Sequence, residues 1–339
     1  MNSLVKLFKI ISIIVLTAGG LLFSASSHSI ENKKLCVWDP SGASGPIMAL
    51  MSDTKVKAIK WGVNLGFLPY TDEKVAVNDF KAGICDAVFL TALQANDFVP
   101  FAASLNAVGG IKSPSELEML LASLSSPKAE SVLTHNNFEV TAIFPIGSVY
   151  FFLGDRSDTS PKNLSGNKFS VLNGDISARK FAELVGGIAV PTTLATWAGM
   201  FNNGNIDVLG APALAYDAFE LQKGLGDRGG IVDYRLQYAL MQVIIRKDSF
   251  PAGFGNNMRQ HSFNRFDEMQ KMVEIAEKNI PDKYWIKLDK ETEAEYDRMA
   301  RYVRLALRDE NLYDKKALRL QWKIRCKSAP SNGECAEAE

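Results

Sequence analysis

The sequence predicts an α/β protein with two similar lobes, and three observations carry this prediction. Segments typical of strands and helices alternate at 35–91 and again at 168–212, and this alternation indicates parallel strands joined by right-handed crossovers. The stretches FKAGICDAVFLTAL (80–93) and FNNGNIDVLGAPAL (201–214) share five residues at identical spacing. With 339 residues, 47% of them hydrophobic, the chain can fill two sizeable cores.

In the first half, the expected elements are strands and helices in strict alternation. They are a strand at 35–40, a helix at 46–60, a strand at 63–69, a helix at 72–82 and a strand at 85–91. Pro40 and the loop SGASG end the first strand, and Gly83 ends the second helix because glycine readily adopts the left-handed cap conformation. SPSE (113–116) has the spacing of an N-cap, N1 and N3, so a further helix begins there.

In the second half, the alternation resumes after a strand-rich stretch. FEVTAIFPIGSVYFFLG, from 138, contains two apolar runs separated by Pro145, and DRSDTSPKNLSGN is a polar connector. The expected elements are a strand at 168–173, a helix at 176–186, a strand at 188–192, a helix at 194–203 and a strand at 206–212.

The repeated stretch occupies the third strand of each unit. In each copy a helix ends on a glycine, and an aspartate opens the next buried strand. The identities are Phe80, Gly83, Asp86, Ala92 and Leu93 against Phe201, Gly204, Asp207, Ala213 and Leu214. Helix–Gly–strand joints are common in α/β proteins, and chance is the alternative explanation for five matches in fourteen. The equal rank of the two copies favours two similar lobes instead.

After the second unit, an apolar strand at 236–248 is suited to cross back between the lobes, and helices follow at 265–279 and 291–325. The last helix is cationic and amphipathic, which suits a membrane or a partner surface; packing on a lobe with a solvated outer face is the preferred interpretation. The predicted division is lobe I at 30–147 and 235–255, lobe II at 148–234, and C-terminal helices at 256–339 that pack across the lobes.

The first residues have the layout of a secretory signal peptide, predicted to span 1–28. Lys6 and Lys9 precede the apolar stretch IISIIVLTAGGLLF (10–23), and the small residues SASSHS follow. An uncleaved anchor is the alternative, but a bilayer span needs about 20 apolar residues. We therefore expect an exported, periplasmic protein.

Charge and motifs point away from nucleic acid and from catalysis. Basic and acidic residues balance at 38 each, with no dense Lys/Arg run before residue 300. No nucleophile elbow, zinc-protease motif or phosphate loop is present. The loop SGASGP can present backbone N–H groups to an anion, although a helix cap is its commoner meaning. We expect no enzyme activity and no cofactor.

The four cysteines are interpreted as disulfides because the protein is predicted to be exported. They are Cys36, Cys85, Cys326 and Cys335, and their spacing alone leaves three pairings open. Metal binding is not expected, because no Cys-x-x-Cys pair exists and the three histidines are scattered.

The stretch SPKNLSGNKFSVLN (160–173) resembles the segment that opens the second lobe of TRAP-transporter (DctP-like) receptors, which are periplasmic solute-binding proteins. The residues that fit the family pattern are Leu164, Gly166, Lys168, Val171 and Asn173, followed by Gly187, Pro191, Trp197, Gly204, Asp207 and Pro212. The similarity extends over about 35–290. More narrowly, the chain resembles the AdeT-type solute-binding proteins, some of which are called RND-type efflux components linked to antibiotic resistance.

The resemblance implies the two-lobed periplasmic-binding-protein fold, with a doubly wound, mostly parallel sheet in each lobe and a cleft that closes on a small molecule. Ligands meet the carboxyl ends of strands in such folds. The candidate ligand-binding residues are Trp38, Asp39, Ser41, Tyr70, Thr91, Tyr150, Ser170, Asn173, Asp175, Trp197 and Tyr216. Each of them also has an ordinary role in a core or a turn. We expect a monomeric, non-catalytic receptor that serves a membrane transporter.

Two other function classes remain open at this stage. One is a soluble periplasmic accessory component of an RND-type multidrug efflux system, which needs no small ligand. Ligand-dependent closure favours the receptor, and stable pairing with an efflux assembly favours the accessory role. The other is an enzyme on the same fold, which needs a reactive pair that the sequence does not offer.

The resemblance also implies what the protein does not bind. The receptors hold a carboxylate with an arginine of the second-lobe motif, which forms paired charge-assisted hydrogen bonds. This chain has Ser170 at that position and Tyr150 near the place of a second family arginine. Unless Arg156 or Arg179 substitutes, we expect a neutral or cationic ligand with an apolar body, held by aromatic walls and by Asp39 or Asp175.

A lobe with strand order 2-1-3 also predicts the disulfide pairing. Its first and third strands are neighbours, so Cys36 and Cys85 lie close enough to bond. Cys326 and Cys335 then close a short loop in the tail.

Overall fold

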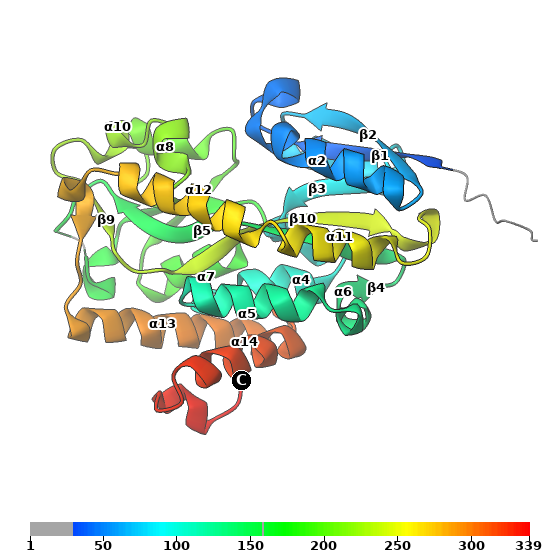
Figure 1. Ribbon diagram of the computed structural model, residues 1–339. Coiled ribbons are helices and arrows are strands. Elements are labelled where there is room, and N and C mark those ends of the chain that lie inside the picture. Colours follow the sequence, from blue (N-terminus) through cyan, green and yellow to red (C-terminus); the bar gives the residue numbers. More distant parts are fainter. Residues whose placement is uncertain (1–29, 158) are drawn as a thin grey trace, which may run out of the picture. The chain divides into compact units, whose positions relative to one another are not determined.

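A single mixed sheet forms the centre of the protein (Figure 1). The computed structural model describes residues 30–157 and 159–339, so the signal peptide predicted at 1–28 lies outside the described residues. Within that part of the chain the sheet has eleven strands, with the main path β2-β1-β3-β10-β5-β8-β6-β7. The strands are β1 (Glu31–Trp38), β2 (Val63–Tyr70), β3 (Ala87–Thr91), β4 (Thr134–His135), β5 (Phe138–Leu153), β6 (Lys168–Leu172), β7 (Ile188–Thr192), β8 (Val208–Pro212), β9 (Gly230–Val232), β10 (Gln237–Arg246) and β11 (Trp285–Ile286).

The two ends of the sheet have the same topology. Strands β2-β1-β3 are parallel and are flanked by the antiparallel β10. Strands β7-β6-β8 are likewise parallel and are flanked by the antiparallel β5. Each half therefore has the order 2-1-3, which confirms the predicted pair of α/β lobes.

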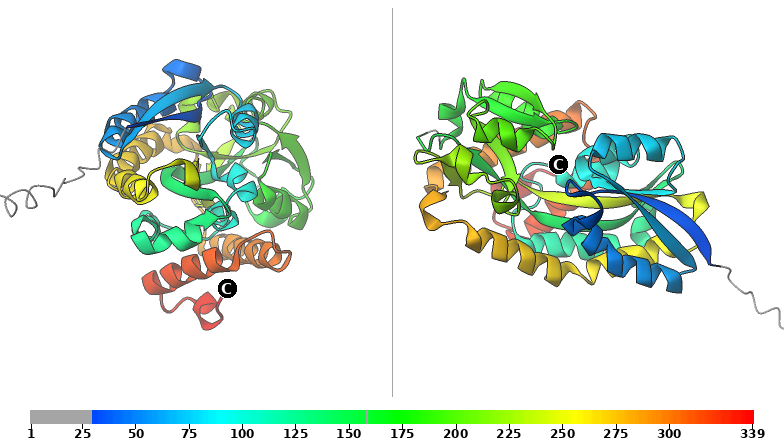
Figure 2. Two further views of the ribbon diagram at one scale, coloured as in Figure 1. Left: turned by 90° about the vertical axis from the view of Figure 1, so that its right-hand side faces the viewer. Right: turned by 90° about the horizontal axis from the view of Figure 1, so that it is seen from above.

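Helices cover both faces of the sheet, as the view from above in Figure 2 shows. In the first half, α2 and α11 pack on one face and α3, α4 and α5 on the other. In the second half, α7 and α13 cover one face and α8 the other. The helices are α2 (Pro46–Lys60), α3 (Glu73–Lys81), α4 (Pro100–Ala103), α5 (Pro114–Ser125), α6 (Glu130–Leu133), α7 (Ile176–Leu184), α8 (Trp197–Asn202), α9 (Ala215–Ala218), α10 (Gln222–Leu225), α11 (Phe254–Phe263), α12 (Phe266–Asn279), α13 (Lys290–Asp309) and α14 (Lys315–Ser328).

The repeated stretch builds the same joint twice. Gly83 and Gly204 have φ of +79° and +71°, so each ends its helix in the left-handed conformation that glycine tolerates. Asp86 then accepts a hydrogen bond from the Lys34 backbone N–H at 2.7 Å, and Asp207 accepts one from Lys168 at 2.8 Å. In each half the aspartate thus ties the third strand to the first.

Strand β5 differs from the two separate runs expected around Pro145. It is one strand of 16 residues that passes from one half of the sheet to the other. Pro145 is accommodated at a bulge, where the register to β10 shifts between Ala239 and Leu240, and bulges are where a sheet tolerates proline. Gly147, with φ of +109°, lies in the same irregularity.

The C-terminal helices pack on both halves, with α13 against α7 and α14 against α5 (Figure 1). Tyr296 and Val303 of α13 are fully buried, and Arg304 is buried with them and paired with Glu334 and Glu339. None of the helices in the described part of the chain combines the length and apolarity needed to cross a bilayer.

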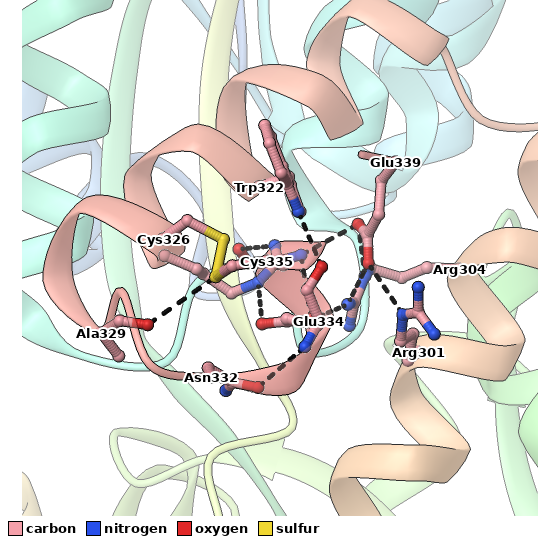
Figure 3. Close-up of a disulfide and its surroundings, with 11 residues drawn as sticks. Arg301, Arg304, Trp322, Cys326, Ala329, Asn332, Glu334, Cys335 and Glu339 are labelled. Carbon is pink, nitrogen blue, oxygen red and sulfur yellow. Dashed lines mark hydrogen bonds and ion pairs between the residues drawn. A yellow bond between two sulfur atoms is a disulfide. The ribbon is translucent and has the colours of Figure 1, made fainter. Parts of the chain in front are cut away.

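Both disulfides have the predicted pairing. Cys36 and Cys85 are joined within the first half, with their Cα atoms 5.8 Å apart. Cys326 and Cys335 are joined in the tail (Figure 3). The loop that this bond closes carries Glu334, which forms ion pairs with Arg304 and Arg325 of α13 and α14.

Candidate functional site

A cavity of about 430 Å³ lies at the carboxyl ends of the parallel strands. Trp38 and Thr91, the last residues of β1 and β3, line it from the first half of the sheet. Leu172 and Pro212, the last residues of β6 and β8, line it from the second half. The topology therefore places the cavity between the two halves, where ligands of α/β proteins bind.

The repeat contributes symmetrically to this cavity. Leu93 and Leu214, the last residues of the two copies, both line it. Leu93 lies in the 3-10 segment Ala92–Asp97 after β3, and Leu214 lies after β8. In each copy the residues after the buried strand therefore place a leucine side chain in the cavity wall.

The wall is mainly apolar. Aliphatic and aromatic side chains from both halves form most of it: Val108, Ile146, Val149, Phe151, Phe169, Phe181, Leu194, Trp197, Phe219, Leu236, Leu240 and Met241. Asp175 is the one charged side chain among the described residues of the wall, which include no Lys, Arg or His. The cavity is thus suited to an apolar body.

A few polar groups interrupt this wall: Ser41, Thr91, Asn106, Ser170, Asp175, Ser177, Gln237 and the indole of Trp197. The Trp197 N–H and the Asn106 side-chain oxygen are buried and have no hydrogen-bond partner among residues 30–157 and 159–339. Buried polar groups are usually paired, and leaving one unpaired costs about 1–3 kcal/mol. Such groups in a cavity wall are candidate contacts for a ligand.

The N-terminus of α2 borders the cavity through Pro46 and Ile47. The Asp39 carboxylate occupies it: Oδ2 accepts hydrogen bonds from the N–H groups of Ile47 at 2.8 Å and Met48 at 3.0 Å, and Oδ1 accepts one from Ser41 at 2.9 Å. A Cβ on Gly45 would lie 2.0 Å from Asp39 Oδ1, so glycine is needed for this fit. The loop SGASGP therefore presents its N–H groups to the protein's own carboxylate.

The N-terminus of α7 is occupied in the same way. Asp175 Oδ1 accepts hydrogen bonds from the Ala178 N–H and the Ser177 hydroxyl, at 2.8 and 2.7 Å. Burial raises the pKa of the Asp175 carboxyl above its usual range. Helix N-termini attract anions, and those of α2 and α7 already hold a carboxylate of this chain.

Ser170, which stands where TRAP-type receptors have their carboxylate-binding arginine, is part of the cavity wall. Ser170 lines the cavity and its hydroxyl lies 2.8 Å from that of Thr192. The two arginines considered as substitutes do not line it. Arg156 donates to the backbone carbonyls of Gly229 and Lys283, and Arg179 is exposed.

Six of the eleven candidate ligand-binding residues lie together in the wall: Trp38, Ser41, Thr91, Ser170, Asp175 and Trp197. Five others do not line the cavity: Asp39, Tyr70, Tyr150, Asn173 and Tyr216.

Other contacts explain where these five lie. Asp39 caps α2, and Asn173 accepts a hydrogen bond from Gln94 through its backbone oxygen. The Tyr70 hydroxyl donates to Asp79, and its burial raises the pKa of Tyr70 to about 12. The Tyr150 hydroxyl donates to Glu277, and Tyr216 packs beside Tyr284.

Sequence reasoning missed Asn106, Ser177 and Gln237. Asn106 ends a short 3-10 turn, Ser177 lies in the first turn of α7, and Gln237 begins β10. Asn106 and Gln237 do not directly follow one of the parallel strands whose ends guided the prediction, and Ser177 lies two residues beyond the predicted Asp175. Gln237 is a polar residue at the start of a mainly apolar strand, and that position is the signal by which it could have been found.

A two-lobed α/β fold with a cavity at the strand ends of both lobes is typical of solute-binding proteins. The chain belongs to the family described as Solute-binding protein AdeT 1/2, whose model matches residues 46–339. It is 36% identical over 300 residues to the "Probable solute-binding protein AdeT1" of Acinetobacter baumannii, covering 88% of this chain and 99% of that one. The identity to the "Probable solute-binding protein AdeT2" of the same organism is 23% over 232 residues, covering 68% and 98%.

Solved structures of TRAP periplasmic solute-binding proteins share the fold. One from Ochrobactrum anthropi, with its C-terminus bound in its ligand-binding pocket, aligns with a TM-score of 0.71 at 13% identity, covering 92% of this chain and 100% of that one. One from Xanthobacter autotrophicus with bound β-D-galacturonate gives 0.66 at 18% identity, covering 86% and 99%. One from Desulfovibrio salexigens with bound orotic acid gives 0.68 at 12% identity, covering 87% and 99%. The resemblance predicted from the second-lobe motif is confirmed.

Proposed function

We propose that this protein is a non-catalytic periplasmic receptor that captures a small molecule with an apolar body, neutral or cationic, in the cavity between its lobes. The observation that carries the proposal is the wall itself, which is apolar and has Asp175 as its one charged side chain among the described residues. Burying apolar surface stabilises a complex by about 25 cal/mol per Å² before the costs of association. An apolar body is therefore the main source of affinity.

The same wall disfavours organic acids. A carboxylate entering it finds no cation among the described lining residues, and the N-termini of α2 and α7 are already occupied by the carboxylates of Asp39 and Asp175. A lost charged hydrogen bond costs about 1.5–3 kcal/mol. Organic acids such as galacturonate, found in a structural neighbour, are therefore expected to bind this protein weakly.

The lobe boundaries belong to the same proposal, with lobe I at 30–147 and 235–255 and lobe II at 148–234. Support comes from the sheet: β5 pairs with β10 up to Val149, and from Val149 onward with β8. An export signal at 1–28, a monomeric state and service to a membrane transporter complete the proposal; the TRAP-like fold supports the transporter. The intact mass of the protein purified from the periplasm tests the cleavage site.

Isothermal titration tests the ligand class. Orotate, galacturonate and C4-dicarboxylates are titrated into the wild-type protein, and we expect no binding in the micromolar range. Ser170→Arg, which restores the family arginine inside the cavity, is the matched variant and is expected to gain affinity for these acids. Micromolar binding to the wild type that Arg156→Ala or Arg179→Ala abolishes would contradict the proposal, because it would mean that the carboxylate clamp has moved.

Native mass spectrometry of gently purified protein gives a second test. A retained neutral or amine-containing molecule that leaves when Ala239→Phe fills part of the cavity wall supports the receptor. A stable complex with an efflux assembly, with the cavity variant unaffected, supports the accessory role instead.

A further inference from the structure

A second, smaller cavity adjoins the first. It has a volume of about 170 Å³ and lies between the segment Ala92–Asp97 and the start of α7. Leu93, Asn106, Asp175 and Ser177 line both cavities, so these residues form a shared wall. A ligand that fills the larger cavity can therefore place one end against this wall.

The shared wall is rich in hydrogen-bond acceptors. Asn106 is 8% exposed, and its side-chain oxygen has no partner in the described part of the chain. The Ser177 hydroxyl lies 2.7 Å from Asp175 Oδ1 and 3.2 Å from Gln237 Oε1. A hydroxyl has one proton, so it donates to only one of these two oxygens at a time.

The wall also carries an acidic side chain that has no cationic partner among the described residues. Asp175 forms no ion pair with any Lys, Arg or His of residues 30–157 and 159–339, unlike the buried Glu139 and Glu339, which are paired with arginines. The Asp175 side chain is half-buried, and the donors that it does have, the Ala178 N–H and the Ser177 hydroxyl, are neutral. A group that brings both a positive charge and several N–H donors would satisfy Asp175 and the two amide oxygens together.

We propose that Asn106, Asp175 and Gln237 form an amine-binding site, in which a protonated amine of the ligand donates to their side-chain oxygens while its apolar body fills the larger cavity. This inference rests on the proposed function, since the apolar body supplies most of the affinity. A protonated amine offers up to three N–H donors on a compact cation, and Asn106, Asp175 and Gln237 each bring a side-chain acceptor oxygen to the wall of the larger cavity. The site thereby assigns the ligand class: an organic amine with an apolar body.

Three probes with one common body test the site by titration calorimetry: phenylbutylamine, phenylbutanol and phenylbutyrate. The wild-type protein is expected to bind the amine at least about tenfold more tightly than the alcohol, since a charge-assisted hydrogen bond is worth more than a neutral one. Phenylbutyrate, which brings a second negative charge to Asp175, is expected to bind most weakly.

Asp175→Asn isolates the charge, because asparagine is also a good N-cap and keeps an acceptor oxygen for α7. In this variant the affinity for the amine is expected to fall to that for the alcohol, while the affinity for the alcohol stays within about twofold of its wild-type value. Asp72→Asn is the matched control: Asp72 caps α3 through Lys74 and Val75 but lines neither cavity. Asn106→Leu is a second variant, expected to weaken the amine severalfold without changing the cap.

The outcomes separate the site from the proposed function. Equal affinities of amine and alcohol for the wild type, or an amine preference that persists in both Asp175→Asn and Asn106→Leu, overturn the amine site and leave the apolar receptor standing. If no probe binds the wild type, or if Ala239→Phe leaves all affinities unchanged, the proposed function fails as well. Circular dichroism melting of each variant establishes that it is folded.

Discussion

Asp39→Ala removes a carboxylate that the structure places against three backbone N–H groups. They belong to Ser41, Ile47 and Met48, at 2.8–3.0 Å, and the Asp39 side chain is fully buried. Removing an N-cap side chain costs about 0.5–2 kcal/mol, and leaving further buried donors unpaired adds to this. We expect a loss of about 3 kcal/mol in the free energy of unfolding, or roughly 6 °C in melting temperature for a protein of this size.

The matched control is Asp72→Ala, which removes an exposed cap of α3 that accepts from two N–H groups. Water can replace this carboxylate, so the expected loss is only about 1 kcal/mol. Urea unfolding of both variants measures the difference. A further assay adds formate, which is small enough for the space that the shorter side chain leaves; 100 mM of an anion with a Kd near 10 mM would restore about 1.4 kcal/mol. Wild-type protein is expected to show no such gain.

Gly45 supplies a double-mutant cycle for the same reasoning. A Cβ at Gly45 would overlap the Asp39 carboxylate, although its φ of −78° suits any residue. Gly45→Ala is therefore expected to destabilise the wild type by more than about 1 kcal/mol and to cost almost nothing in the Asp39→Ala background. Equal costs in the two backgrounds, together with no effect of formate, would refute the assignment of Asp39 as the protein's own anion at this helix.

Three further predictions concern stability and closure. Burial raises the pKa of Glu73 from 4.5 to about 7. The stability that its protonated form contributes is therefore complete below pH 4.5 and is lost as the pH rises through 7, a loss of about 2–3 kcal/mol in the free energy of unfolding. In unfolding curves measured from pH 4 to 8, Glu73→Gln is expected to remove this pH dependence. Replacing Cys36 and Cys85 by alanine opens a loop with a sequence separation of 49 and is expected to lower the free energy of unfolding by about 4 kcal/mol. Removing the tail disulfide, with a separation of 9, is expected to lower it by about 2.7 kcal/mol. Equal losses would contradict the argument that the longer closed loop stabilises more. Gly174→Ala puts a Cβ 2.7 Å from the backbone oxygen of Leu93 in the other half of the fold. We expect this variant to bind phenylbutylamine severalfold more weakly than Gly166→Ala, in which φ is also positive but the added Cβ meets nothing within 4 Å. Equal affinities of the two variants would mean that this contact does not matter for closure of the lobes.

The sequence by itself determined the features that depend on local pattern. The alternation of strands and helices and the glycine that ends each repeated helix follow from periodicity and cap chemistry. The strand order of a doubly wound lobe came with the resemblance, and the Cys36–Cys85 pairing followed from that order. Asp86 and Asp207 were recognised as a repeated pair for the same reason. Only the structure shows why the aspartate is repeated: in each copy it accepts a hydrogen bond from the backbone of the neighbouring strand.

The composition of the site was decided by tertiary structure. Asp39 and Asp175 both follow strands and looked alike in the sequence, and each caps a helix, but only Asp175 also lines the cavity. Asn106 and Gln237 join Asp175 from segments far away in the chain. A residue's neighbours in sequence fix its backbone conformation, whereas the atoms that its side chain meets come from distant segments. For that reason the position of the cavity could be predicted, and the balance of acceptors and charge around it could not.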